Sequence, residues 1–443
     1  MVTVAPAAEL SAKPAGEQPG SSRTLLSLAA ALIFTLVSIA VWLLFLRPNW
    51  PMYWHQVDLQ VYMWGGRTAA VHPEQLYVER GPLYLPFLYP VFAAWICAEL
   101  ARFPIDYVGN GVAVTTMLAL YASVWCTGRL LRLRGRGLLA LTLAVGSAAL
   151  WLEPVQQTFQ FGQVSVILMA MVLADLAMPD RWYRGILIGI ATGIKLTPAV
   201  FIVYLLITRR FKAAGTAIGA FAVTVAIGFW YRPAQAWQFW TSTVASQDRV
   251  GFAYVQNQSI NGVFGRLQWT TWEHHLPWLI AAGVLAVAGM AAAWIAHRRG
   301  DELLGILLAA GVTLLCSPIS WTHYWVWVIP ALMWAVQALS GRPLVLRAAV
   351  PVAVGLLAFA WPMRVDRIGN WDPDVALLPQ GLIWYVPQTM GREFHWTVIQ
   401  FFVGNSYTLL GGAAFLAAVG YLIYSARPGQ RAGTSARSSA AAT

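Results

Sequence analysis

The sequence predicts an all-α, polytopic membrane protein. Of its 443 residues, 58% are apolar and only 11% are charged, whereas a soluble domain carries about 25% charged residues. Apolar runs of about 20 residues, the length that crosses about 30 Å of hydrocarbon, recur along the whole chain. The 23 Trp and 16 Tyr residues suit a protein with two membrane interfaces, where such rings collect. The chain therefore has too few charges to coat a water-soluble particle.

The apolar runs predict the membrane-spanning helices. The first, at 24–46, follows a polar leader that is too long for an ordinary signal peptide, so we expect a retained helix. The next predicted spans are residues 107–127, 138–152, 163–178, 213–231, 277–296, 303–320, 324–338, 345–361 and 406–424. Residues 1–23 and 425–443 lack an apolar period and predict disordered tails. Residues 24–424 are thus expected to form a single membrane domain.

Two apolar segments differ from a simple span. Residues 185–208 have Arg or Lys on both flanks and are interrupted by Lys195 and Pro198, which predicts two short helices hinged there. Residues 83–101 follow Pro82 and contain Pro86 and Pro90, and we expect a re-entrant or interfacial helix. With the hinged pair counted twice, this interpretation predicts about twelve passes through the bilayer.

The charge distribution predicts the orientation in the membrane. The net charge is +11, and more than half of the 29 Lys and Arg residues fall in the tails and in short loops on the same side as both termini. The positive-inside rule makes that side cytoplasmic. Basic residues spread between spans argue against a nucleic-acid partner. Cys97, Cys126 and Cys316 form an odd set in apolar stretches and indicate neither a disulfide framework nor a metal site.

Five polar motifs fall at the opposite face of the membrane in this topology. They are VDLQVY at 57–62, TFQFGQ at 158–163, GIKLTP at 193–198, NQS at 257–259 and SPISWTHYW at 317–325. Because segments so far apart in sequence converge on one face, they predict an active site there. The chain has no Walker loop, no HExxH and no GxGxxG following a strand, and its cytoplasmic loops are too short for a nucleotide-binding domain. A lipid-linked donor therefore fits better than a nucleotide sugar.

The ionisable residues of these motifs are the candidate catalytic groups. Asp58 could serve as a general base, or be a solvated carboxylate or helix cap. His323, with an unperturbed pKa near 6.5, suits proton abstraction but could be a structural histidine at a helix end. Lys195 within a span is a functional-site candidate by default and could meet a phosphate, unless it extends to the interface. Asp58 with Glu153 could hold a metal weakly; no metal or cofactor is predicted.

The amides of the motifs are candidate sugar ligands. Gln160 and Gln163 could bind a sugar, or cap the following helix. Asn257 and Gln258 could contact carbohydrate; together with Ser259 they also match a glycosylation sequon, a pattern with many false positives.

These five motifs, in this order, resemble glycosyltransferase family 87, the actinobacterial polyprenyl-phosphate-mannose-dependent α-(1→2)-mannosyltransferases with a GT-C fold. The resemblance covers about residues 24–424. It implies a catalytic domain that moves mannose, with inversion, from polyprenyl-phosphate-mannose to phosphatidylinositol mannoside, lipomannan or lipoarabinomannan. It places the reaction on the outer face of the plasma membrane. Asp58 matches an acidic residue expected to be required, and His323 matches a second candidate base. Tyr324 stands where relatives often carry another histidine.

The implied chemistry accounts for the candidate residues. A phosphate-linked sugar has a good leaving group, so the reaction needs a base for the acceptor hydroxyl and positive charge for the phosphate. Asp58 or His323 could supply the base and Lys195 the charge, with help from Arg67 or Arg266. A groove between tilted helices would hold the polyprenyl chain. Two alternatives remain: a different lipid-linked sugar, such as polyprenyl-phosphate arabinofuranose, or a lipid or sugar transporter with broken helices.

Overall fold

The structure is a computed structural model that describes residues 19–46, 56–245, 251–269, 275–363 and 378–425. Residues 1–18 and 426–443, which make up most of the two predicted tails, lie outside the described residues. Helix α1 (Pro19–Val41) begins inside residues 1–23, the segment predicted as a disordered tail, so the helix starts earlier than the apolar run does. Helix α18 (Ser406–Tyr424) ends where the last apolar run ends.

Five helices in the described part of the chain are long and apolar enough to cross a membrane: α1, α4 (Ile105–Leu130), α10 (Phe211–Tyr231), α13 (Leu276–Arg298) and α18. A sixth span would be the pair α6 (Glu153–Phe161) and α7 (Ser165–Ala177), which is bent by 115°. Large apolar side chains point outward from these helices, as a lipid-facing surface requires. Examples are Ile33, Leu118, Val223, Val287 and Leu416. The chain is therefore a multi-pass α-helical membrane protein, and the count of twelve passes stays a prediction.

The remaining helices are short. They are α2 (Val57–Val71), α3 (Val91–Leu100), α5 (Gly135–Ala149), α8 (Ile186–Ile194), α9 (Ala199–Ile207), α11 (Pro233–Thr241), α12 (Ile260–Arg266), α14 (Glu302–Cys316), α15 (Val328–Ala338), α16 (Leu344–Leu357) and α17 (Val398–Gly404). Several occupy predicted spans but end earlier, because the chain leaves the helix at a polar motif. The predicted hinge is confirmed, since α8 ends at Ile194 and α9 begins at Ala199. Between α14 and α15 the chain forms the 3₁₀-helix η6 (Thr322–Trp327).

The proline-rich segment 83–101 does not form a full span. Its helix α3 has 10 residues and is about 15 Å long, half of the hydrocarbon thickness. It packs against α2 and α10. The prolines thus exclude a spanning helix, as the sequence predicts; its re-entrant or interfacial position stays a prediction.

Two three-residue strands depart from the expected all-α architecture. Strand β1 (Trp361–Met363) pairs antiparallel with β2 (Leu378–Gln380), next to the 3₁₀-helix η7 (Leu382–Tyr385). Just before β1, the chain forms a bridge to the α5–α6 junction, where Glu153 N donates to Ala358 O at 2.7 Å. The carbonyl group at the end of α16 therefore accepts from a backbone N–H group that the break between α5 and α6 leaves without a partner inside a helix.

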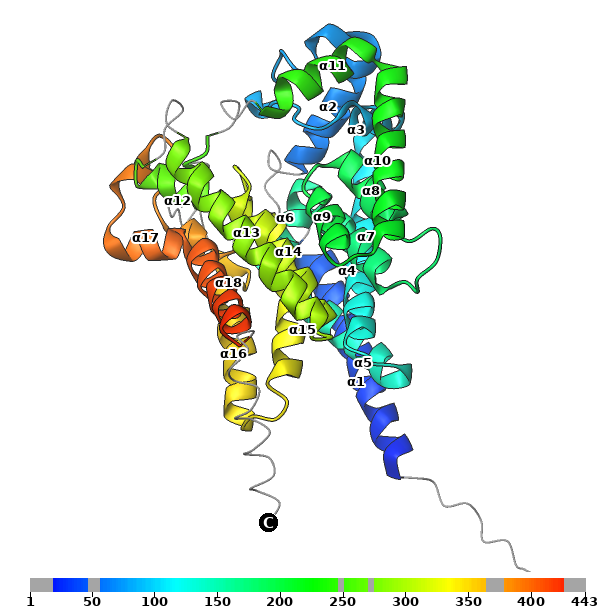
Figure 1. The fold of residues 1–443 in the computed structure, drawn as a ribbon, viewed down its shortest axis with the longest axis vertical. Helices are drawn as coiled ribbons and strands as arrows, with labels where there is room; N and C mark the ends of the chain where they lie inside the picture. The colour runs from blue at the N-terminus through cyan, green and yellow to red at the C-terminus, as the bar shows by residue number, and fades with distance from the viewer. Residues whose placement is uncertain (1–18, 47–55, 246–250, 270–274, 364–377, 426–443) are drawn as a thin grey trace, which may run out of the picture.

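Short helices gather at one end of the molecule. In Figure 1, α2, α3 and α11 lie at the upper end of the long axis, and α12 and α17 lie high on the other side of the molecule. Helices α1 and α16 extend toward the opposite end. The main apolar core joins residues of α4, α7, α9, α13, α14 and α18. The polar motifs lie at the helix breaks beside this core, and these breaks form the candidate site.

Candidate active site

Asp58 lies in the first turn of α2, where two of the motifs meet. Its Oδ2 accepts a hydrogen bond from Gln163 Nε2 at 2.6 Å, and the neighbouring Gln56 N donates to Gln160 O at 2.7 Å. The approach is close, because a Cβ at Gly162 would come within 2.8 Å of Leu59 Cβ. Gly162 also has φ +66, a conformation that suits glycine. The turn between α6 and α7 thus brings Gln163 to the carboxylate.

The environment makes Asp58 a stronger base than an ordinary aspartate. Burial raises the pKa of its carboxyl to about 6, while the hydrogen bond from Gln163 and the charge of Lys195 partly oppose the rise. A general base works best when its pKa lies near the working pH. Asp58 is therefore ionised at neutral pH and well matched to accept a proton.

Lys195 follows α8 at the hinge and directs its ammonium group into an aromatic setting. Its Nζ lies 3.8 Å from the ring centre of Tyr324 and 5.4 Å from that of Tyr89. The atom is buried, and no hydrogen-bond partner for it exists among the described residues. Aromatic faces stabilise a cation without neutralising it. Burial lowers the pKa of Lys195 to about 7, against the charge of Asp58, which acts to raise it. An anionic ligand would favour the charged ammonium form.

His323 is buried in η6 beside the same tyrosine. Its ring lies edge-on to the rings of Tyr324 and Phe161, with 4.8 and 5.8 Å between the ring centres. Neither ring nitrogen has a hydrogen-bond partner in the described part of the chain. Burial, together with the charge of Lys195, lowers the pKa of His323 well below its ordinary value. The imidazole is therefore neutral and a weak base.

Two tyrosines complete the cluster and were not singled out from the sequence. The hydroxyls of Tyr62 and Tyr89 hydrogen-bond at 2.7 Å, and Tyr77 fixes the loop by donating to Tyr89 O. Burial raises the pKa of Tyr62 and Tyr89, so both phenols stay neutral. Tyr62 lies four residues after Asp58, on the same face of α2, a spacing that could have indicated it. Tyr89 reaches the site only through tertiary packing.

Arg67 is not brought to this cluster. It is exposed and lies nine residues after Asp58, which places it on the opposite face of α2 and about 13 Å further along. A contribution of Arg67 to the phosphate site stays a prediction that this geometry does not support.

Arg266 is 4% exposed and turns inward. Its Nε and one terminal nitrogen donate to Asn405 Oδ1 at 2.9 and 2.6 Å. The terminal nitrogens also donate to the carbonyl oxygens of Ala253, Tyr254 and Asn257. All three guanidinium nitrogens therefore have protein partners, which favours a structural role.

Asn257 and Gln258 likewise bond to the protein. Asn257 Oδ1 accepts from Ser320 N at 2.9 Å, and its Nδ2 donates to Pro318 O at 3.2 Å. Gln258 Nε2 donates to Gly404 O at 2.7 Å. The bonds of Asn257 hold the segment that leads into η6 and so support the position of His323. The bond of Gln258 holds the chain where α17 ends. Contact of the two amides with substrate remains a prediction.

We expect Arg266→Gln to lower the free energy of unfolding. Hydrogen bonds to charged groups contribute about 1.5–3 kcal/mol each, and glutamine cannot replace all five. The loss should be at least about 2 kcal/mol, measured as a lower melting temperature of the detergent-solubilised protein. Arg67→Gln, at an exposed position, is the control and should melt like wild type. An unchanged melting temperature of the Arg266 variant would contradict the structural role.

The carboxylates suggested as a weak metal site have separate partners. Asp58 bonds to Gln163, whereas Glu153 Oε2 accepts from Tyr407 OH at 2.7 Å. Among the residues that the structure describes, no group of three or more His, Cys, Asp and Glu side chains is placed to hold a metal ion.

The site combines a carboxylate base with an aromatic-flanked cation, both at helix breaks within a membrane protein. That arrangement can deprotonate a hydroxyl group and stabilise a departing anion, the two requirements of group transfer from a phosphate.

Comparison with known proteins agrees with this chemistry. The sequence model of glycosyltransferase family 87 matches residues 87–318. A Mycolicibacterium smegmatis protein is 35% identical over 90% of this chain and 94% of its own. It is named a polyprenol-phosphate-mannose-dependent alpha-(1-2)-phosphatidylinositol pentamannoside mannosyltransferase. A Mycobacterium tuberculosis protein is 31% identical over 81% of this chain and 87% of its own. It is named a polyprenol-phosphate-mannose-dependent alpha-(1-2)-phosphatidylinositol mannoside mannosyltransferase.

No solved structure matches the chain. The family model itself reaches Gln163 and Lys195 but begins after Asp58 and ends before His323. The sequence matches are sufficient, because these relatives are more than 30% identical and the matches cover most of both chains. The chain therefore belongs to glycosyltransferase family 87 and is a multi-pass membrane glycosyltransferase.

Proposed function

We propose that this enzyme transfers mannose from polyprenol-phosphate-mannose to a phosphatidylinositol mannoside, forming an α-(1→2) linkage with inversion. The names of the relatives support the donor and the acceptor. The observation that carries the mechanism is that Asp58, whose pKa is about 6, and the buried side-chain nitrogen of Lys195 act on each other electrostatically within one cluster.

In the proposed reaction, Asp58 accepts the proton of the acceptor's 2-hydroxyl group as that oxygen attacks C1 of the mannose. The bond from C1 to the phosphate oxygen breaks, and Lys195 stabilises the charge on the departing polyprenyl phosphate. Attack opposite the phosphate converts a β-linked donor into an α-linked product. A phosphate leaves without a proton, so the mechanism requires no general acid.

Asp58 is a better candidate for the base than His323. The low pKa of His323 makes it a weaker proton acceptor than a carboxylate with a pKa of about 6. As a neutral imidazole whose two nitrogens have no partner among the described residues, His323 is suited to hydrogen-bond the donor's sugar or phosphate.

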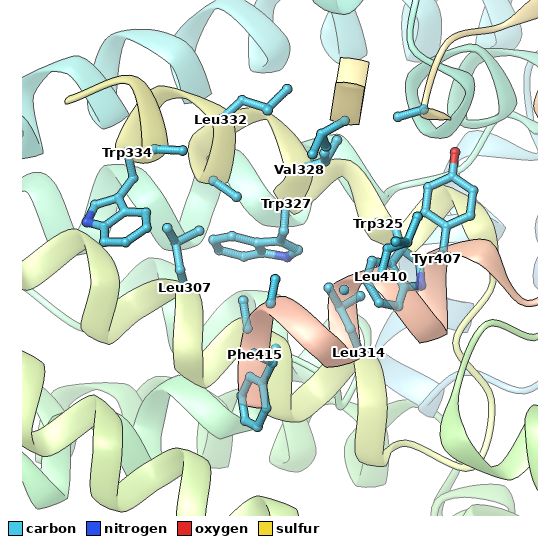
Figure 2. A pocket seen from close by; sticks show the side chains of 18 of the residues that line it. Leu307, Leu314, Trp325, Trp327, Val328, Leu332, Trp334, Tyr407, Leu410 and Phe415 are labelled. Carbon is cyan, nitrogen blue, oxygen red and sulfur yellow. The ribbon is translucent and has the colours of Figure 1, made fainter. Parts of the chain in front are cut away.

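An apolar cavity supports a polyprenyl donor. It measures about 370 Å³ and lies between α14, α15, α16 and α18. In Figure 2, Trp327 projects into its middle, between Leu307 and Leu314, while Trp325 and Tyr407 stand together at one end. Leu314 and Trp327 also line a smaller cavity of about 50 Å³ that reaches Lys195. An isoprenoid chain in the large cavity would thus have its phosphate directed toward the ammonium group.

We further propose a GT-C fold within residues 24–424, both termini in the cytoplasm, and catalysis at the outer face of the plasma membrane. The excess of basic residues beside the termini supports this orientation. In Figure 1, α2, which begins with the Asp58 turn, lies at the opposite end of the molecule from the start of α1.

The direct test is mannose transfer by the purified protein, with polyprenyl-phosphate-mannose as donor and phosphatidylinositol mannosides and lipomannan fragments as acceptors. The expected product loses its new mannose to an α-(1→2)-specific mannosidase. Polyprenyl-phosphate arabinofuranose is the competing donor. Transfer from that donor alone, or none from the mannose donor to any acceptor, would refute the proposal.

A further inference from the structure

Helix α6 carries a polar face that is buried rather than exposed. Glu153, Gln156, Gln157 and Gln160 follow the spacing i, i+3, i+4 and i+7, which places them on one face. Their exposed fractions are 0, 1, 1 and 5%. The other side of the helix packs normally, since Phe159 lies 4.8 Å from Trp42, ring centre to ring centre. A row of carboxylate and amide groups is thus covered by protein.

The cover comes from segments that are distant in the sequence. Tyr407 of α18 donates to Glu153 Oε2 at 2.7 Å. Gly381 lies so close that a Cβ there would come within 2.7 Å of Glu153 Cγ. Thr322 of η6 and Trp384 of η7 also lie beside the carboxylate. The Glu153 end of the polar face is therefore enclosed by η6, the segment 381–384 and α18.

The enclosed groups satisfy one another only in part. Thr322 and Trp384 direct their donors at the Glu153 carboxylate. The unpartnered acceptors of this face are the amide oxygens of Gln156 and Gln157, which have no hydrogen-bond partner in the described part of the chain. Each such buried atom costs about 1–3 kcal/mol, and native proteins contain few of them. Two on one face indicate groups arranged for another molecule.

The chemistry of the row identifies the class of ligand. The amide oxygens of Gln156 and Gln157 offer acceptors. When the segment 381–384 moves away, the Glu153 carboxylate loses its contact with Trp384, and the two groups then offer a further acceptor and a donor. No Lys or Arg contributes to this set, so it fits a neutral ligand rich in hydroxyl groups. From Glu153 to Gln160 the face is about 10 Å long, the length of a short oligosaccharide. Beyond Gln160, the chain turns to Gln163, which holds Asp58 at 2.6 Å.

We propose that the polar face of α6 is the subsite for the mannose units of the acceptor that precede the one that reacts. A glycan laid along α6 has its reacting end at Asp58 and its inner mannoses at Gln157 and Glu153. Because Glu153 is fully buried, the segment 381–384 separates from α6 when the glycan enters. This subsite selects acceptors by the number of mannoses they carry. The inference rests on the proposed function.

The test compares Glu153→Gln with wild type on two acceptors: the shortest mannoside that wild type uses and a phosphatidylinositol mannoside with several mannoses. Glutamine keeps the size of the side chain and can still bond to Tyr407. We expect KM for the longer acceptor to rise at least about tenfold relative to KM for the shorter one, with KM for the donor unchanged. Gln157→Leu should change the same ratio in the same direction.

Thr158→Ala is the matched control. Thr158 is buried in the same helix, but its hydroxyl donates to Pro154 O at 2.7 Å, off the polar face. It should leave the ratio of the two KM values unchanged. An equal loss on both acceptors in Glu153→Gln and Gln157→Leu, or an altered KM for the donor, would overturn the subsite.

Binding measured without turnover separates this inference from the proposed function. If wild type transfers mannose to no acceptor, the proposed function fails. Binding of α-(1→2)-mannotriose, followed by saturation-transfer NMR, still tests the subsite. Binding to wild type that weakens in Glu153→Gln supports it, and binding that is absent or unchanged in the variant refutes it. If Glu153→Gln does not fold, Gln157→Leu provides the same comparison.

Discussion

Asp58→Asn should abolish mannose transfer while the protein stays folded. Asparagine keeps the shape of the side chain and can still accept from Gln163, the bond measured at 2.6 Å, but it cannot take a proton from the acceptor hydroxyl. Loss of a general base reduces the rate by about 10²- to 10⁴-fold. The measurement is the initial rate of transfer, with size-exclusion chromatography and melting temperature as the controls for folding. A folded variant with full activity would eliminate Asp58 as the base.

The pH dependence of wild type is a second readout of the same residue. Because burial raises the pKa of Asp58 to about 6, the carboxylate is lost below that pH, and kcat/KM should fall on the acid side of pH 6. The sign for stability is opposite. A carboxyl whose pKa is higher in the folded state destabilises the fold as pH rises through that pKa. The free energy of unfolding of Asp58→Asn, relative to that of wild type, should therefore be higher at pH 7.5 than at pH 5.

Lys195→Met should have the second large effect. Methionine can occupy the space of the lysine stem between the rings of Tyr89 and Tyr324, but it removes the charge that the departing phosphate needs. By analogy with the loss of one transition-state donor, we expect kcat to fall by about 10²- to 10³-fold. Binding of polyprenyl phosphate, measured by its protection against thermal unfolding, should weaken as well.

Lys212→Met is the control for Lys195→Met. It removes a lysine at an exposed position in α10 and should leave both the rate and the binding of polyprenyl phosphate near wild type. Lys195→Arg should keep part of the phosphate binding. If Lys195→Met retains the wild-type rate and affinity, the phosphate is neutralised elsewhere.

The sequence by itself determined the class of protein and where the helices break. Length, low charge and recurring apolar runs require a helical membrane protein, because only helices and closed barrels satisfy the backbone in lipid. Lys195 and Pro198 interrupt an apolar stretch, and the helix does stop between Ile194 and Ala199. Charges and prolines act locally, so their effect on a helix can be predicted without knowing its neighbours. The five motifs also sufficed to indicate the family.

Only the tertiary structure decided which polar side chains face the site. Asn257, Gln258 and Arg266 are residue types that often bind sugars or phosphates. In this structure their side-chain nitrogens instead donate to backbone carbonyls and to Asn405. Gln163 reaches Asp58, and Glu153 meets residues of η6, η7 and α18. In a soluble protein, apolar periodicity separates inside from outside. In a membrane protein both sides of a helix can be apolar, and a buried polar group bonds to whichever partner packing brings near. The sequence around an Asn or Gln therefore does not show whether its amide contacts a ligand or hydrogen-bonds to the protein's own backbone.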